Sequence, residues 1–116
     1  MAAATAASLG RAFGQQTAEE FAGDGVQAPV KLSPSAVMDW MEIAGYGAKL
    51  GSSGSGETVI EVHNCVYREL SKEFPEVVCA FDRSMLCGML GVESSVHTQT
   101  HALSSGDSYC RHEFRL

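Results

Sequence analysis

All four cysteines and all four histidines of the 116-residue chain lie in its C-terminal half, between His63 and Leu116. Thiolates and imidazoles are ligands that proteins commonly offer to zinc, and thiolates also hold iron–sulfur clusters. No two cysteines form a Cys-x-x-Cys pair, so spacing alone leaves two interpretations open. Either folding gathers the cysteines around a metal, or they are inert thiols buried in the core, where unpaired cysteine is common.

Three of the cysteines stand beside predicted elements whose ends can meet. Cys65 follows a predicted strand, Cys79 lies in the first turns of a predicted helix, and Cys110 lies near the start of the last predicted strand. His101 precedes a predicted hairpin turn, which places it near Cys110 across the two strands. Three thiolates and one imidazole would close a tetrahedral zinc site or hold an iron–sulfur cluster. We therefore predict Cys65, Cys79, Cys110 and His101 as metal ligands.

The fourth cysteine and the remaining histidines are weaker candidates. Cys87 follows Cys79 by eight residues on the same predicted helix, which separates the two side chains by about 80° around the axis. We interpret Cys87 as a packing residue, with a role as fourth ligand as the alternative. The other imidazoles are interpreted as surface or structural groups, although His63 could orient a neighbouring ligand. They are His63, His97 and His112.

The elements that would position these groups begin with a helix over residues 2–22. Large or β-branched side chains recur there at every fourth residue, which is typical of an amphipathic helix. These residues are Leu9, Phe13, Thr17 and Phe21. Gly10 and Gly14 would let another backbone approach closely. We interpret the helix as a core-packing element, and the alternative is a contact between two copies of the chain.

A second helix is predicted from Ser35 to about Leu50, after the capping pair Ser33-Pro34. Trp40 and Met41 lie on its apolar side and are our candidate residues for binding a small apolar ligand. The simpler interpretation is that both belong to the core. The Gly- and Ser-rich residues 51–56 that follow predict a flexible loop.

The second half of the sequence predicts a mixture of strands and helices. In order these are a strand over 58–63, a short helix over 65–74, a longer helix over 75–90, and strands over 94–103 and 108–116. A hairpin turn at Ser104–Asp107 joins the last two strands. With the two N-terminal helices the order is ααβααββ. This order predicts a single α+β domain over residues 1–116 with a small antiparallel three-stranded sheet.

Composition limits the partners and the compartment. The net charge is −6 and the eight basic residues do not cluster, so we expect no binding to nucleic acid by the chain alone. No apolar run is long enough for a membrane span, and the N-terminus lacks the features of a signal peptide. We therefore predict a cytoplasmic protein, where thiols stay reduced and bind metals more often than they form disulfides.

Residues 58–116 also carry a resemblance to a known family. The matching residues are His63-Asn64-Cys65, Phe74-Pro75-Glu76-Val77-Val78-Cys79, Thr100-His101, Gly106-Asp107 and Cys110. In this order they resemble the C-terminal sensor domain of the iron–sulfur-dependent Suf-operon repressors, which regulate transcription. The resemblance implies that Cys65, Cys79 and Cys110 hold an iron–sulfur cluster, with His101 as the candidate fourth ligand. The whole chain is also similar to 4-vinyl-reductase-type and methanogen-output-type sensory domains, some of which hold zinc, and distantly to aminothiazoline-carboxylate hydrolases.

These observations favour a stand-alone metal- or iron–sulfur-binding sensor domain. The sequence contains no helix-turn-helix, so we do not carry over a repressor's function on DNA. We expect a homodimer that serves a protein partner. The first alternative is a domain that binds a small apolar ligand, with structural or zinc-holding cysteines. The second is a hydrolase with Cys65 or Cys79 as nucleophile, but no Cys-His or Ser-His-Asp spacing supports catalysis.

Overall fold

The computed structural model describes most of the chain as helices packed against one sheet. Described are residues 3–23, 30–52, 57–63, 73–101 and 109–115, without the side chains of Ser52 and His101. The helices in this part are α1 (Ala3–Ala22), α2 (Pro34–Ala44) and α4 (Pro75–Leu90), with a 3-10 turn η1 (Ser94–Val96). The strands are β1 (Ala48–Ser52), β2 (Thr58–Val62), β3 (His97–His101) and β4 (Cys110–Phe114). The predicted α+β class is confirmed.

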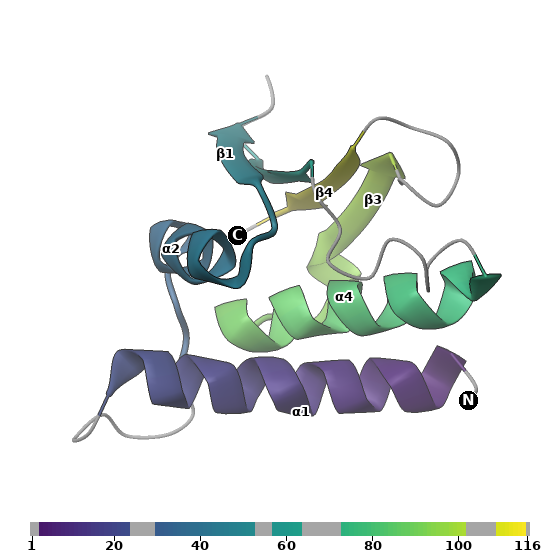
Figure 1. Cartoon of the computed structure of the whole chain (residues 1–116), viewed down its shortest axis with the longest axis horizontal. Helices are drawn as coiled ribbons and strands as arrows, with labels where there is room; N and C mark the ends of the chain where they lie inside the picture. Colours follow the sequence, from purple (N-terminus) through teal and green to yellow (C-terminus); the bar gives the residue numbers. More distant parts are fainter. Residues whose placement is uncertain (1–2, 24–29, 53–56, 64–72, 102–108, 116) are drawn as a thin grey trace.

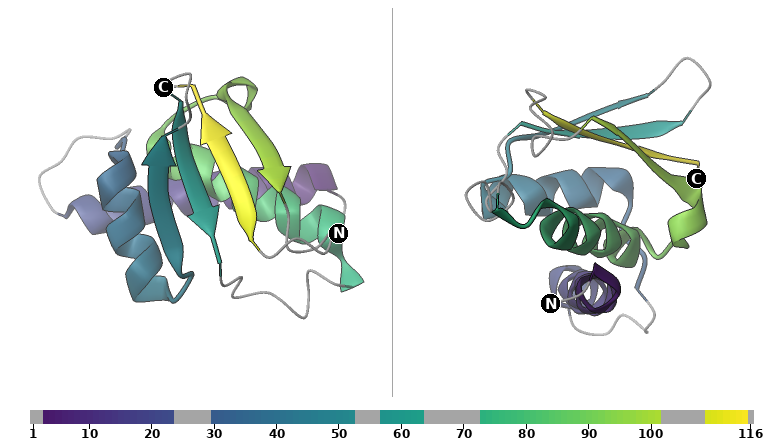
Figure 2. Two further views of the ribbon diagram at one scale, coloured as in Figure 1. Left: turned by 90° about the horizontal axis from the view of Figure 1, so that it is seen from above. Right: turned by 90° about the vertical axis from the view of Figure 1, so that its right-hand side faces the viewer.

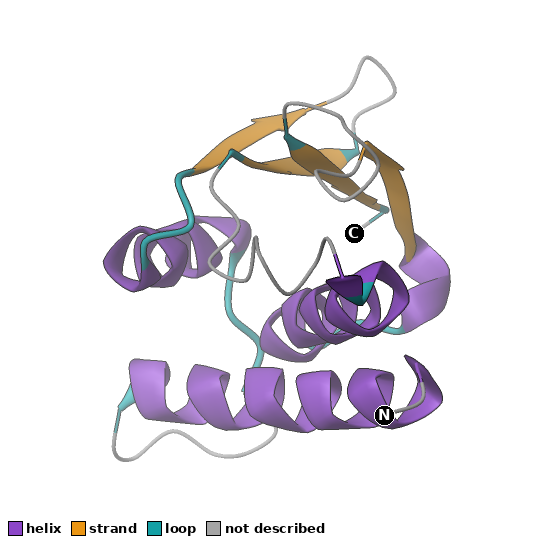
Figure 3. Ribbon diagram, turned by 45° about the vertical axis from the view of Figure 1, so that its right-hand side comes forward, coloured by secondary structure: helices purple, strands orange, loops and turns teal. Residues whose placement is uncertain are grey.

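The described strands form one antiparallel sheet with the order β1-β2-β4-β3. Figure 1 and Figure 2 show three layers, with the sheet on one side, α4 and α2 beneath it, and α1 beneath α4. Figure 3 shows the strands gathered on one side of all the helices. The space between α4 and the sheet is therefore enclosed from both sides and holds the core.

The core consists of side chains from the inner face of the sheet, from α2 and from α4. Its largest fully buried members are Val37, Met41, Ile60, Met85, Leu86, Cys87, Met89 and Phe114. Directly opposite residues of β2 and β4 share a face, so Ile60 pairs with His112 and Val62 with Cys110 on the inner side. Polar groups thus enter an otherwise apolar layer at the start of β4.

The sheet has four strands in the described residues, so the predicted three-stranded sheet is wrong. The missed strand is β1, which pairs along its whole length with β2. We expected these residues to end the second helix and to begin the Gly- and Ser-rich loop. The helix instead ends at Ala44, because Gly45 adopts the left-handed conformation (φ 88°) and its amide closes the cap onto Met41 and Glu42.

The other predicted boundaries either agree closely with the structure or fall outside the residues that it describes. The 75–90 helix is confirmed at both ends, with Pro75 in its first turn and Gly91 as a left-handed cap (φ 68°). The strand predicted over 94–103 begins only at His97, because Ser94–Val96 form η1 first. Most of the predicted 65–74 helix and the turn at 104–107 fall outside the described residues. None of the described helices is long and apolar enough to cross a membrane.

The predicted first helix is confirmed, but the face that it buries is not the one we expected. Leu9, Phe13 and Phe21 are 49%, 42% and 39% exposed. The buried positions carry small side chains instead: Ala6, Gly10, Gly14, Thr17 and Ala18. One of these large side chains, Phe13, is still partly covered, because it packs against Trp40 and Phe81.

The small residues of α1 let its backbone touch the backbone of α4. A Cβ atom added to Gly10 would lie 2.3 Å from the Phe81 carbonyl oxygen, and one added to Gly14 would lie 2.2 Å from that of Met85. Gly88 of α4 makes the reciprocal approach to Arg11. The two helices run parallel (Figure 1). The glycines therefore serve a contact within the chain, so a homodimer would need another surface.

Ser33 caps α2, and its substitution measures how much this cap contributes to the stability of the fold. Its hydroxyl oxygen accepts a hydrogen bond from the Ala36 amide at 3.2 Å, and Pro34 follows in the first turn. Ser33→Ala should lower the free energy of unfolding by about 1 kcal/mol, measured by urea denaturation. Ser35→Ala, at an exposed position of the same turn, is the control. Equal losses in both variants would contradict a capping role.

Candidate functional site

A small cavity between α4 and the inner face of the sheet is bordered by one cysteine, one histidine and one aspartate. It is lined by Met41, Tyr46, Val62, Asp82, Met85, Leu86, Cys110 and His112. The space open to the centre of a water molecule is about 10 Å³. That is room for about one water molecule or one ion. A thiol, a carboxyl and an imidazole therefore border a space of ionic size inside an apolar layer.

Cys110 and His112 both reach the cavity because they are two residues apart on β4. Residues two apart on a strand share a face, so both side chains point from the sheet toward α4. Their partners across β2 are Val62 and Ile60, which are buried. Cys110 and His112 therefore lie on one face of the sheet. The sheet supplies a sulfur and an imidazole to one wall, and α4 supplies Asp82 to the other.

Asp82 is a carboxyl group held in an apolar setting without compensation. Its Oδ1 atom is buried and has no hydrogen-bond partner among the described residues. Burial raises the pKa of Asp82 from its ordinary value of 3.8 to about 7. The carboxyl group therefore resists ionisation far more than an exposed aspartate does. An orphaned buried oxygen of this kind fits a metal site, because a bound cation would satisfy it.

His112 forms a buried pair with His97 of β3. The two imidazoles are 2.8 Å apart, between His97 Nε2 and His112 Nδ1, so one ring donates its proton to the other. The His97 ring also packs on Phe114, with 5.0 Å between ring centroids. Only 3% of His112 is exposed. The pair therefore fixes the orientation of His112 and leaves its Nε2 atom for other contacts.

Both histidines of the pair are neutral at physiological pH. Burial, with the positive charge of Arg83, lowers the pKa of His97 from 6.5 to about 4. Burial, the neighbouring His97 and Arg83 together lower the pKa of His112 to about 3. The neutral imidazole is the form that binds a metal ion.

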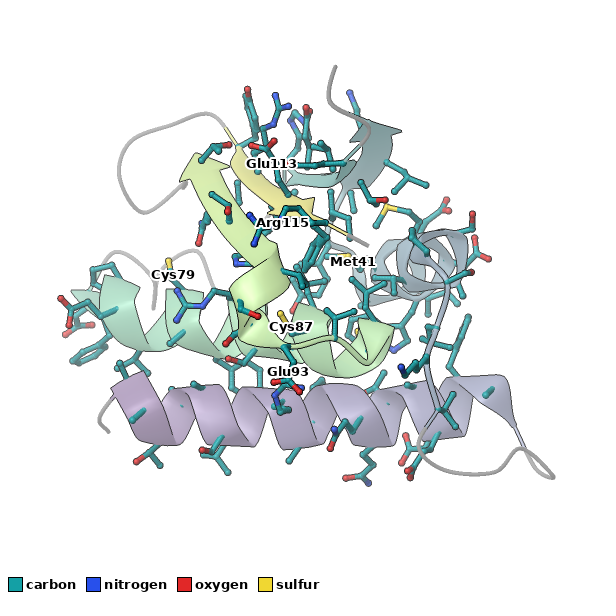
Figure 4. The ribbon with its side chains drawn as sticks, turned by 180° about the vertical axis from the view of Figure 1, so that it is seen from behind. Met41, Cys79, Cys87, Glu93, Glu113 and Arg115 are labelled. Atoms are coloured by element: carbon teal, nitrogen blue, oxygen red, sulfur yellow. The ribbon has the colours of Figure 1, made fainter. Side chains whose placement is uncertain are left out.

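Cys79 lies on the same face of α4 as two residues of the cavity wall. Asp82 follows it by three residues and Leu86 by seven, positions that neighbour one another along one side of a helix. Figure 4 shows the Cys79 side chain on the side of α4 that faces away from α1. Cys79 is half-buried. Two of the predicted ligands, Cys79 and Cys110, thus belong to the two elements that enclose the cavity.

The remaining predicted ligands are only partly placed. Cys65 lies outside the described residues, three positions after Val62, which stands opposite Cys110 in the sheet. His101 ends β3 opposite Arg111, after an irregularity in the register, and its side chain is not described. Within the described parts of the chain, no three His, Cys, Asp or Glu side chains are grouped closely enough to hold a metal ion. The four-ligand site therefore stays a prediction.

Cys87 is fully buried in the core cluster, as expected of a packing residue. Burial, as the largest influence, raises the pKa of its thiol, which keeps it protonated and unreactive. Its neighbour Gly88 faces the backbone of α1. Cys87 is therefore a suitable internal control for experiments on the other cysteines.

The two candidate ligand-binding residues of α2 face different surroundings. Met41 is 1% exposed and lines the cavity. Trp40 is half-buried and packs edge-on against Phe13 and tilted against Tyr46, with 6.4 and 6.0 Å between ring centroids. The space beside Met41 is far below the about 300 Å³ that small-molecule pockets usually offer. An apolar ligand would need this layer to open.

The sequence interpretation did not include Asp82 among the candidate site residues, and it did not foresee that His97 and His112 form a pair. A signal for Asp82 was present, since it follows Cys79 at helical spacing on an otherwise apolar face. A signal for His112 was its position two residues after Cys110, alternating with the outward Arg111. The pairing with His97 depends on strand register and had no local signal.

Comparison with models of protein families, with curated proteins and with solved structures finds no match to the chain. The resemblance described above therefore rests on the quoted residues alone. What the protein does must be argued from the cavity, its lining and the neighbouring thiols.

Proposed function

We propose that the protein is a stand-alone sensor domain that binds zinc or an iron–sulfur cluster through Cys65, Cys79 and Cys110, with His101 as a further ligand. The observation that supports the proposal is the position of Cys79 and Cys110 on the two elements that enclose one small cavity, which Asp82 and His112 also line. The register that pairs Val62 with Cys110 also supports it, because the chain toward Cys65 leaves β2 from that point. Thiolates from separate layers are a common basis for metal sites.

Binding at this position would couple the metal to the stability of the fold. A ligand set drawn from α4 and β4 links the helical layer to the sheet, and ligand binding to the folded state stabilises it by mass action. At a free metal concentration of about 100 times Kd, the gain is about 2.7 kcal/mol. A partner protein could read the change in rigidity of this layer, which would serve a sensor.

The proposal is tested with protein purified without oxygen. We expect a stoichiometric metal content or a visible cluster absorption, and a melting temperature that rises on adding zinc or iron with sulfide. Cys79→Ser and Cys110→Ser should each lower metal affinity about tenfold or more, while Cys87→Ala, in the core, should leave it unchanged. Colourless, metal-free protein whose melting temperature ignores both additions would contradict the proposal.

The apolar-ligand alternative has less support. Met41 does line the cavity, but the space holds about one water molecule, and Trp40 faces α1 instead.

A further inference from the structure

We propose that an open pocket beside the end of α4 binds a small zwitterion of the free amino acid type. The pocket lies between α1, the residues that lead into α2 and the residues that follow α4. Its described lining shares no residue with the cavity between α4 and the sheet. Figure 4 shows Glu93, one of its charged residues, beside the ribbon of α1. Binding there would be independent of the proposed metal site.

The pocket combines the size of a small-molecule site with a charged lining. Its volume is about 420 Å³, within the roughly 300–1,000 Å³ of ordinary small-ligand pockets. The charged and amide side chains on its walls are Arg11, Gln15, Glu19, Lys31 and Glu93. Such a lining favours a small polar ligand over an apolar one.

The walls of the pocket are held in place by contacts within the fold. The glycines of α1 and α4 keep the two helices at backbone contact. The Leu32 amide donates a hydrogen bond to the Met89 carbonyl oxygen at 2.9 Å, which ties the segment before α2 to the end of α4. The Arg11 guanidinium donates to the Val92 carbonyl oxygen at 2.9 Å, which ties α1 to the residues after α4. A ligand would therefore enter a preformed site, where binding costs little ordering of the walls.

The charges in the pocket are balanced and available. Arg11, Gln15 and Glu19 recur at every fourth residue, so a cation, an amide and a carboxylate lie in a row along one side of α1. Lys31 and Glu93 line the other walls. Within the described residues, the side chains of Glu19, Lys31 and Glu93 form no hydrogen bond or ion pair with the protein. A ligand can therefore bind them without breaking an existing contact.

This balance of charge selects a ligand that carries both signs. A simple anion would be attracted by Arg11 and Lys31 but repelled by the two carboxylates, and a simple cation would meet the converse. A molecule with one carboxylate and one ammonium group can pair with both. The Arg11 guanidinium has further N–H donors beside the one that contacts Val92, and these can bind the carboxylate of the ligand. Glu19, about two helical turns away, can bind its ammonium group.

Nuclear magnetic resonance of the isotope-labelled full chain tests for this ligand. The common amino acids are added one at a time at millimolar concentration, with a chelator present so that no metal binds. We expect at least one of them to shift the amide resonances of Gly88, Gly91 and Val92 in a saturable way. Its N-acetyl derivative and its carboxamide should bind about tenfold more weakly or worse, because each lacks one of the two charges. Undiminished binding of both derivatives would overturn the inference.

Glu19→Gln and Lys31→Gln each remove one charge at an exposed position of the pocket. We expect at least one of these variants to weaken the affinity for the amino acid about tenfold. Glu20→Gln is the matched control and should change nothing, because this exposed carboxylate already accepts a hydrogen bond from its own helix. Retained affinity in both variants, an equal loss in the control, or no saturable shift with any amino acid would overturn the inference. Cys79→Ser and Cys110→Ser should leave amino acid binding unchanged, so the two proposals can fail separately.

Discussion

Replacing Gly14 by alanine is expected to lower the free energy of unfolding by about 3 kcal/mol, near the upper end of what overpacking costs. The added Cβ would lie 2.2 Å from the Met85 carbonyl oxygen and 3.0 Å from the Met89 amide nitrogen. Both neighbours are backbone atoms of α4, so no side chain can move aside. The helices must separate, and the contact between α1 and α4 along their length weakens with them. Urea denaturation measures the loss.

Gly51→Ala is the matched control for this substitution. Among the described residues, no atom lies within 4 Å of a Cβ added to Gly51, and its φ is not positive, so the free energy of unfolding of this variant should change by about 0.5 kcal/mol or less. Gly88→Ala should repeat the large loss from the other helix, since its Cβ would lie 2.4 Å from the Arg11 carbonyl oxygen. Similar stabilities of the Gly14 and Gly51 variants would show that the helices do not pack at backbone contact.

The same glycines explain why the sequence predicted that α1 is a helix but not which of its faces is buried. Periodicity identified the helix, but it assigned the buried face to the largest side chains, because burial of apolar area usually dominates. Here the partner helix approaches so closely that only Gly10 and Gly14 fit, and Leu9 and Phe13 are displaced toward solvent. The distance between two helices depends on both sequences at once. The pattern of residues 2–22 alone therefore cannot predict this distance.

The sequence predicted the strands whose residues alternate strongly, and it failed to predict the strand that is rich in glycine. Thr58–Val62 and Cys110–Phe114 form strands as predicted, and the second of them alternates in burial from Arg111 to Phe114. β1 contains Gly51 and Ser52 and follows Gly45 and Gly47, so its composition indicates a loop. Its strand conformation comes from pairing with β2, a tertiary contact that overrides local propensity.

The sequence predicted which helix and strand contribute to the candidate site, but it did not predict which side chains contact one another there. Cys110 and Met41 do line one cavity, and Cys79 occupies the predicted helix. Asp82 was overlooked because a carboxyl on a helix is ordinarily solvated, and only the sheet above α4 makes its burial evident. The link between His97 and His112 arises from the β3–β4 register, fifteen residues apart in sequence.

Asp82→Asn is expected to raise the free energy of unfolding of the metal-free protein at pH 8 by about 2 kcal/mol or more. Burial raises the pKa of Asp82 from 3.8 to about 7, so the folded state resists ionisation that the unfolded chain accepts. This pKa difference corresponds to about 4 kcal/mol once the pH exceeds 7. The buried amide still lacks partners, which reduces the gain. Urea denaturation with a chelator present, repeated from pH 4 to pH 8, measures it.

The pH dependence identifies the group responsible. A raised carboxyl pKa gives stability that is present below pH 3.8 and lost as the pH rises through about 7, so the advantage of Asp82→Asn should vanish near pH 4. The lowered pKa values of His97 and His112 act in the opposite direction, because stability is lost as the pH falls below 6.5. Both proteins share that loss, so it cancels in their difference. Asp39→Asn should show no such trend, and a constant difference for Asp82→Asn across the range would mean that Asp82 is not buried as a neutral acid.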